Sequence, residues 1–186
     1  MVDSWWLPSA INHQQARCKL RILGIDPGLK RTGYGLVDVT AQYSIKLVEA
    51  GTVEPNEKDI FENRIHKIYI NLEKIVNGQK PDVMVLEKLY AHHKHPITAS
   101  ILGHVRGVIC LLCAQKNVEL VEHSVKRIRQ SLTGNGNATK VQTRRMVASA
   151  FGVKEEQLTL DASDALALAL GYLQMNRDIY DRKVSR

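Results

Sequence analysis

The chain has 186 residues, of which 44% are hydrophobic and 24% charged, a composition typical of one compact globular domain and unlike that of a disordered chain. Lysine and arginine outnumber aspartate and glutamate by 26 to 19, and the net charge of +7 favours a polyanionic partner, either nucleic acid or an acidic membrane surface. We see no apolar run of about 18 residues, no secretory leader and no disulfide framework among three cysteines, so we expect a cytoplasmic protein that spans no membrane.

The first half of the chain opens with residues 1–20, which have no clear hydrophobic period. We interpret them as an N-terminal extension that precedes the folded domain. Residues 21–26 are short and apolar, as in a buried strand, and 34–39 and 45–53 are predicted to be two further strands. Sequential strands usually lie side by side, so these three should form a meander.

A helical period then begins, because the apolar residues of 57–76 fall at steps of three and four. Gly78 and Pro81 should end this helix. The elements that follow are a short apolar strand at 82–87, a helix at 97–116 and a strand at 118–121.

The last third of the chain is predicted to be helical. It contains a basic stretch at 124–132, a loop at 133–139, and helices at 140–151 and 162–175. We therefore expect one domain over 21–176, followed by a basic tail at 177–186. The order of the elements indicates the α/β class, with a five-stranded mixed sheet flanked by helices.

Four acids stand where a site could form. Asp26 and Glu87 end two predicted strands, and sites in open α/β sheets form at the carboxyl edge. Asp161 and Asp164 are three residues apart at the start of an apolar helix, so they should share one face.

Each acid also has a purely structural interpretation. Asp26 could cap its turn, Asp161 could be a helix N-cap, and Asp164 could simply lie near the positive end of the helix. Residues 165–170 weaken this interpretation, because they are apolar all round and indicate a buried helix. An acid that enters a buried region needs a partner or a metal ion.

Divalent cations would stabilise four carboxylates around one point. Oxygen ligands without a histidine and cysteine set favour Mg²⁺ or Mn²⁺ over zinc. Two such ions about 4 Å apart can act on a phosphodiester. A basic protein with this site is a candidate nuclease.

Six motifs occur in one order along the chain: GIDPG (24–28), TGYG (32–35), LEKLY (86–90), LGHVRGV (102–108), TGNGNATK (133–140) and DASDALALA (161–169). Together they make the sequence from about residue 22 to residue 173 resemble the RuvC-type Holliday junction resolvases. The resemblance implies an RNase H-like fold and paired symmetric nicking of four-way DNA junctions, in recombination and repair. It also implies a homodimer whose contact involves residues 97–116, and a branch-migration helicase as a further partner.

The resemblance implies roles for individual residues. The catalytic and metal-binding acids would be Asp26, Glu87, Asp161 and Asp164, with two Mg²⁺ ions per active site and Mn²⁺ as a substitute. The DNA-binding residues would be Tyr90, Arg129 and Lys140. Tyr90 would stack on junction bases, the alternative being ordinary packing at a strand end.

Basic residues surround the glycine loop. Arg129 and Lys140 could be solvated charges, but they belong to a cluster that favours a phosphate-contacting face. Its other members are Lys126, Arg127, Arg144 and Arg145.

The chain departs from the family pattern at three places. Residues 1–20 have no counterpart in the family core. His92, His93 and His95 could trap a metal ion, although we favour an exposed loop that faces the junction. Cys110 and Cys113 form a C-x-x-C inside an apolar helix, which we interpret as packing.

Three rival functions remain open. An ATP-binding domain of the sugar-kinase and actin type also opens with a strand, an acid and a glycine turn, but it needs a second domain. A non-catalytic junction-binding protein would not need all four acids. Another RNase H-like nuclease, acting on RNA hybrids for example, would leave the LEKLY and TGNGNATK motifs unexplained.

Overall fold

A computed structural model of the chain describes residues 18–40, 44–88 and 96–176. Its centre is a five-stranded sheet in the order β3-β2-β1-β4-β5. The strands are β1 (Cys18–Asp26), β2 (Thr32–Thr40), β3 (Ile45–Val53), β4 (Val83–Glu87) and β5 (Glu119–His123). β1, β2 and β3 form the predicted antiparallel meander, and β4 and β5 run parallel to β1. The predicted mixed sheet is therefore confirmed.

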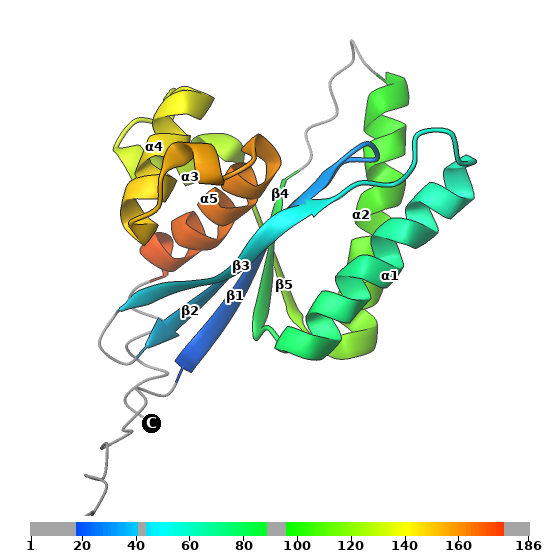
Figure 1. Cartoon of the computed structure of the whole chain (residues 1–186), viewed down its shortest axis with the longest axis horizontal. Helices are drawn as coiled ribbons and strands as arrows, with labels where there is room; N and C mark the ends of the chain where they lie inside the picture. Colours follow the sequence, from blue (N-terminus) through cyan, green and yellow to red (C-terminus); the bar gives the residue numbers. More distant parts are fainter. Residues whose placement is uncertain (1–17, 41–43, 89–95, 177–186) are drawn as a thin grey trace, which may run out of the picture.

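Helices cover both faces of the sheet (Figure 1). One face carries α1 (Phe61–Gln79) and α2 (Pro96–Lys116), and the other carries α3 (Val125–Thr133), α4 (Lys140–Phe151) and α5 (Leu160–Met175). A short 3₁₀ turn, Glu155–Gln157, precedes α5. α5 packs on β1 and β2, and α3 and α4 pack on α5. α2 is the crossover that the parallel pair β4 and β5 requires.

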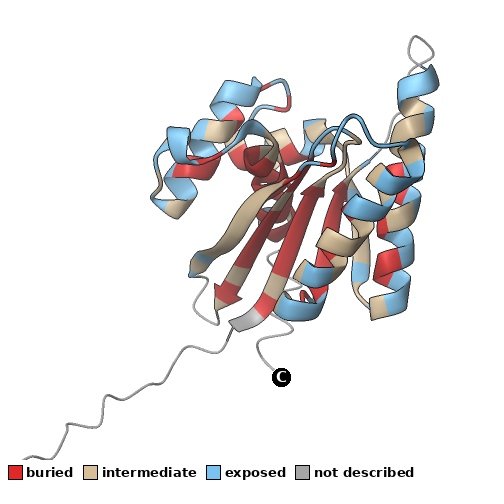
Figure 2. Cartoon of the chain, turned by 45° about the vertical axis from the view of Figure 1, so that its right-hand side comes forward, coloured by how far each residue is buried: buried red, intermediate tan, exposed pale blue. Residues whose placement is uncertain are grey.

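The central strands are buried on both faces, which explains their continuous apolar sequences (Figure 2). In β1, Ile22 belongs to the hydrophobic cluster on the α5 side of the sheet. Leu23 and Ile25 belong to a second hydrophobic cluster on the α1 and α2 side. Successive residues of β4 alternate in the same way, with Val83 and Val85 on the α5 side and Met84 and Leu86 on the other. The acids that end these two strands therefore stand at the rim of a doubly covered sheet.

Three glycines let α5 lie directly on the sheet. A Cβ atom at Gly24 in β1 would stand 2.0 Å from the main-chain oxygen of Ala165, and one at Gly33 in β2 would stand 2.1 Å from that of Asp161. A Cβ atom at Gly35 would lie 2.6 Å from the side chain of Leu166. The contact is thus backbone against backbone, and it fixes the start of α5 near the end of β1.

Two helices begin two or more residues away from the predicted positions, whereas α2 and α3 differ from prediction by one residue and α4 by none. α1 begins at Phe61 rather than at 57, because Asn56 accepts a hydrogen bond from the main-chain N–H of Lys58 and holds a turn there. Gly78 does not stop α1, which runs to Gln79 and ends with Lys80 in the left-handed conformation (φ 48°). α5 begins at Leu160 rather than at 162, since Thr159 is its N-cap.

α2 has an outer face that the rest of the described chain leaves uncovered. Leu111 is 54% exposed, and Cβ atoms added at Gly103 and Gly107 would meet no heavy atom within 4 Å. By length and composition alone, α2 is the one helix in the described segments that could cross a membrane, which the sequence analysis did not anticipate. Core helices of water-soluble proteins pass the same test, and α2 packs against α1 and β5.

Candidate active site

Asp26 and Glu87 lie side by side at one edge of the sheet. β1 and β4 are parallel neighbours, and their register pairs Ile25 with Leu86, the residues that precede the two acids. The turn after Asp26 is held by Thr32, whose hydroxyl donates to the main-chain oxygen of Gly28 at 2.7 Å. The strand ends thus bring together two acids that are 61 residues apart in the sequence.

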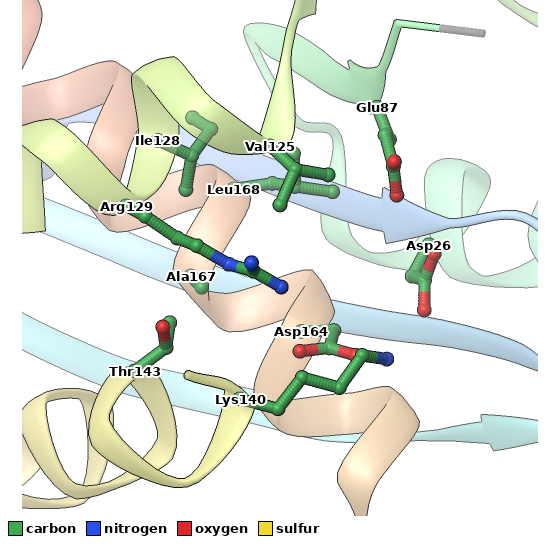
Figure 3. A pocket seen from close by; sticks show the side chains of 10 residues that line it. All are labelled: Asp26, Glu87, Val125, Ile128, Arg129, Lys140, Thr143, Asp164, Ala167 and Leu168. Atoms are coloured by element: carbon green, nitrogen blue, oxygen red, sulfur yellow. The ribbon is translucent and has the colours of Figure 1, made fainter. Parts of the chain in front are cut away.

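Asp164 joins them from α5. The three acids line a cavity of about 230 Å³, together with Arg129 from α3 and Lys140 from α4 (Figure 3). Its remaining lining residues are Val125, Ile128, Thr143, Ala167 and Leu168. The cavity therefore combines three carboxylates with two cationic side chains.

Asp161 occupies a different place from the other three acids. It lies in the first turn of α5 and lines a neighbouring groove of about 710 Å³ with Gly28 and Leu29. Its negative charge is nevertheless close enough to contribute to the raised pKa of Asp26. Three of the four predicted acids thus share the cavity, and the fourth stands beside it.

The carboxylates disfavour one another's ionisation. Burial, followed by the charges of Asp164 and Glu87, raises the pKa of Asp26 to about 7. Burial and the charge of Asp164 likewise raise the pKa of Glu87. Both acids would be stabilised in the ionised form by a cation placed between them.

Lys140 supplies an internal cation to this cavity. It is the first residue of α4, after the N-cap Thr139, which forms a capping box with Gln142. Its ammonium lies 2.7 Å from Oδ2 of Asp164, and this bond raises the pKa of Lys140. The Arg129 guanidinium points into the same space from α3 (Figure 3). The two predicted DNA-contacting cations are therefore at the cavity.

The donor set fits hard divalent cations. Carboxylate oxygens are the ligands that Mg²⁺ and Mn²⁺ prefer, and the raised pKa values show that added positive charge would be favourable here. Among the described residues, no three acidic, histidine or cysteine side chains already form a ligand set around one point. Asp164 is instead held by Lys140, so cation binding requires these side chains to move.

Other predicted residues either are not described or have a different role. Tyr90, His92, His93 and His95 lie outside the described residues. Arg144, predicted to face phosphate, instead donates to the main-chain oxygens of Glu155 and Leu158, so it braces the segment before α5.

The two cysteines of α2 are not bonded to each other. Cys113 is buried with its sulfur 3.3 Å from that of Met84, whereas Cys110 is exposed. Burial raises the pKa of the Cys113 thiol to about 11. This agrees with the packing interpretation of Cys113.

One buried charge beside the cavity was missed in the sequence. Arg106 of α2 is only 9% exposed and donates to the main-chain oxygen of Glu87 and to the carboxylate of Glu122. The signal was present in LGHVRGV, where a lone arginine interrupts a long apolar helix and must therefore find buried partners.

The sequence matches a known family over most of its length. Residues 22–172 match the model of the family described as crossover junction endodeoxyribonuclease RuvC. A protein of that name from Caldicellulosiruptor saccharolyticus is 36% identical over 154 residues, which cover 83% of this chain and 92% of that protein. Another from Rhodopirellula baltica is 35% identical over 159 residues, covering 85% of this chain and 89% of that protein.

Solved structures of resolvases share the fold. The structure of T. thermophilus RuvC in complex with a Holliday junction substrate superposes with a TM-score of 0.79 at 23% identity, covering 87% of this chain and 97% of that one. The yeast mitochondrial Holliday junction resolvase Ydc2 superposes with a TM-score of 0.64 at 14% identity, covering 90% of this chain and 81% of that one. The fold is thus the RNase H-like fold predicted from the motifs.

Proposed function

The chain belongs to the crossover junction endodeoxyribonuclease RuvC family, and from this premise we propose that it cuts four-way DNA junctions at the acidic cavity. As a member of this family, the protein is a DNA-cleaving hydrolase. The observation that carries the choice of site is the pairing of Asp26 and Glu87 at adjacent strand ends, with Asp164 facing them. A non-catalytic junction binder would have no need to keep three partly buried carboxylates in one cavity.

The acids would hold the catalytic metal. We assign Asp26, Glu87, Asp161 and Asp164 to two Mg²⁺ ions, for which Mn²⁺ can substitute. Bound ions of this kind activate water and stabilise the leaving oxygen of a phosphodiester. The chain's own part is to fix the carboxylates on two strands and one helix and to bring phosphate to them with cations.

Arg129 and Lys140 are suited to the phosphate role. Both line the cavity, and the Lys140 side chain is 64% exposed although its ammonium contacts Asp164. We propose that they bind the phosphates next to the cut, as charge-assisted donors. Tyr90 remains a predicted stacking residue, two positions beyond the last described residue of its segment.

The outer face of α2 supports a homodimer. An apolar groove of about 450 Å³ runs between α1 and α2, lined by residues that include Phe61, Ile65 and Leu111. Gly103 and Gly107 face open space, so close approach by another helix is what their lack of a side chain would serve. Two symmetric cuts require two sites related by a two-fold axis, which a second copy on this face supplies.

Two further assignments rest on the family resemblance. We place the protein in the cytoplasm, as a DNA-acting enzyme of a non-membrane family. Engagement by a branch-migration helicase stays a prediction.

The function is tested with a labelled synthetic four-way junction and Mg²⁺. The wild-type protein should make paired symmetric nicks, which EDTA and Asp26→Asn should both abolish. Junction binding by Asp26→Asn should be retained or become tighter, because the change removes a negative charge facing phosphate. Gel assays of cleavage and binding measure both results.

Asp82→Asn is the matched control. Asp82 directly precedes β4, at the end of the strand opposite to Glu87, and its carboxylate accepts a hydrogen bond from the main-chain N–H of Arg21. It should nick as the wild type does. Full nicking by Asp26→Asn would show that the cavity is not the active site. Tight binding without nicks by the wild type, under Mg²⁺ or Mn²⁺, would favour a non-catalytic junction binder.

A further inference from the structure

Arg106 is unusual because it is a charged residue that is buried. It is the only lysine, arginine, aspartate or glutamate in α2 before Lys116, and it points inward among buried neighbours such as Val105 and Ile109. Burying a guanidinium is costly unless every face of it finds a partner. Its partners therefore indicate what the residue is there to hold.

The partners of Arg106 lie at the ends of two adjacent strands. One terminal nitrogen donates to the main-chain oxygen of Glu87, the last residue of β4, and the other donates to the carboxylate of Glu122 in β5. Glu122 stands opposite Leu86 in the parallel register, one step before Glu87. The guanidinium thus links α2, β4 and β5 at the rim that carries the acid.

The end of β4 is also held by β5, where His123 is the register partner of Glu87. Beyond it, the main-chain N–H of Lys88 donates to the oxygen of His123 at 2.8 Å, which ties the end of β4 to β5. Arg106 holds the same peptide unit from the α2 side, because the Glu87 carbonyl that accepts from it and the Lys88 N–H belong to one amide group. The position of this peptide unit helps to set the direction in which the Cα–Cβ bond of Glu87 leaves the strand.

We propose that Arg106 is a positioning residue, which fixes the main chain of Glu87 and so directs its carboxylate at the metal and the scissile phosphate. This inference rests on the proposed function of the cavity. A forked guanidinium serves this role because it can donate to a carbonyl and a carboxylate at once, whereas a lysine ammonium lacks the planar fork. Groups that orient a metal-binding side chain commonly contribute about 10–100-fold to metal affinity or activity.

A comparable arginine, Arg21, lies at the opposite end of the strands from the acidic cavity. Arg21 of β1 also joins a carboxylate and a main-chain carbonyl, with Nε 2.6 Å from Asp38 and Nη1 2.6 Å from the oxygen of Gln79. Arg21 is near the start of β1, and Asp26 ends that strand. Arg21→Gln therefore removes a comparable, partly buried network without touching the acids.

The experiment compares Arg106→Gln, Arg106→Lys and Arg21→Gln in the full chain. We expect Arg106→Gln to lower kcat on the junction by about 10–100-fold while the junction KM changes by less than about 2-fold. Mn²⁺ affinity, measured by calorimetry without DNA, should fall by about 10-fold. Arg106→Lys should recover part of both losses, and Arg21→Gln should keep wild-type kcat and Mn²⁺ affinity although it lowers Tm.

Two results would overturn the inference. One is wild-type kcat and Mn²⁺ affinity in Arg106→Gln. The other is equal losses in Arg106→Gln and Arg21→Gln in proportion to their Tm, which would make both arginines simply structural. Should Arg106→Gln lack a cooperative melt, Arg106→Lys decides, with wild-type values in it counting against the inference.

The two proposals fail separately. A wild-type protein that binds Mn²⁺ but cuts no junction would refute the proposed function. The Mn²⁺ affinities of the Arg106 variants would still judge whether Arg106 positions Glu87.

Discussion

Asp26 changes charge near neutral pH in the metal-free protein. Its pKa is raised from 3.8 to about 7 by burial first and then by Asp164 and Glu87. Because the folded-state pKa lies above the unfolded value, the associated stability is fully present below pH 3.8 and is lost as pH rises through about 7. The shift corresponds to at most about 4 kcal/mol in the free energy of unfolding.

Asn at position 26 imitates the protonated acid, which gives a prediction. In EDTA, the Tm of Asp26→Asn should exceed that of the wild type by several degrees more at pH 8 than at pH 5, because the loss that begins near pH 3.8 is complete only above about pH 7. Thermal unfolding followed by circular dichroism measures this. Saturating Mg²⁺ should raise the wild-type Tm at pH 8 and leave the variant less affected. A Tm difference that is the same at pH 5 and pH 8 would show that Asp26 does not titrate in this range.

Some residues of the cavity could be predicted from the sequence and others could not. Asp26 and Glu87 end apolar runs, and parallel strands bring such ends together, so their meeting follows from pattern alone. Asp164 follows from its place in a buried helix. Asp161 does not, because a shared helical face cannot show that one residue lines the cavity and the other the next groove. The role of Arg106 was not predicted, because its hydrogen-bond partners in β4 and β5 are brought to it only by the tertiary fold.

At the scale of elements, the seating of α5 on β1 and β2 sets the distance between acids of different elements. Gly24→Ala would place a methyl group 2.0 Å from the main-chain oxygen of Ala165, so the helix and strand must separate. Such overpacking costs about 1–3 kcal/mol. A displacement of about 1 Å in a catalytic group can lower the rate about 100-fold. We expect Gly24→Ala to lose stability in urea melts and to nick junctions far more slowly.

Gly78→Ala serves as the comparison for that variant. Gly78 lies within α1, and a Cβ atom there would meet no heavy atom within 4 Å. Alanine should therefore stabilise α1 by about 0.5–1 kcal/mol and leave nicking unchanged. If Gly24→Ala behaved like Gly78→Ala, the close contact between α5 and β1 would not be real in solution.

The order and type of the elements were predictable because short apolar runs indicate buried strands, and because the apolar residues of 57–76 recur at steps of three and four. The residues at which the elements begin and end were less predictable. Asn56 holds a turn before α1, and Thr159 is the N-cap of α5. Side-chain bonds of this kind to the main chain compete with the helical pattern. Gly24 and Gly35 fall within predicted strands, but the pattern of the sequence did not indicate that they admit α5.

At the scale of the molecule, the outer face of α2 should control assembly. Gly107→Leu adds a side chain where the single chain has open space, and leucine favours a helix by about 1 kcal/mol over glycine. The variant should keep its fold, while the added side chain holds a second helix away. We expect sedimentation equilibrium to show a wild-type dimer and a largely monomeric variant that cuts junctions poorly.

Gly78→Leu provides the matched change on α1, since that position is equally open and lies about two and a half turns beyond Tyr69, the last residue of α1 that lines the apolar groove. It should sediment as the wild type does. A Gly107→Leu protein with an unchanged dimer would place the subunit contact on another surface.

The position of β1 has a consequence for how the molecule comes apart. β1 is hydrogen-bonded to β2 on one side and β4 on the other, and its residues Ile22, Leu23 and Ile25 are wholly inaccessible to solvent. Backbone amides in such a strand become accessible only when the whole domain opens, not when an edge or terminus frays. Asp26 ends that strand, so breathing motions at the periphery leave it in place. We therefore expect amide hydrogen exchange in β1 to require global unfolding, so that Asp26 keeps its place beside Glu87 as long as the domain stays folded.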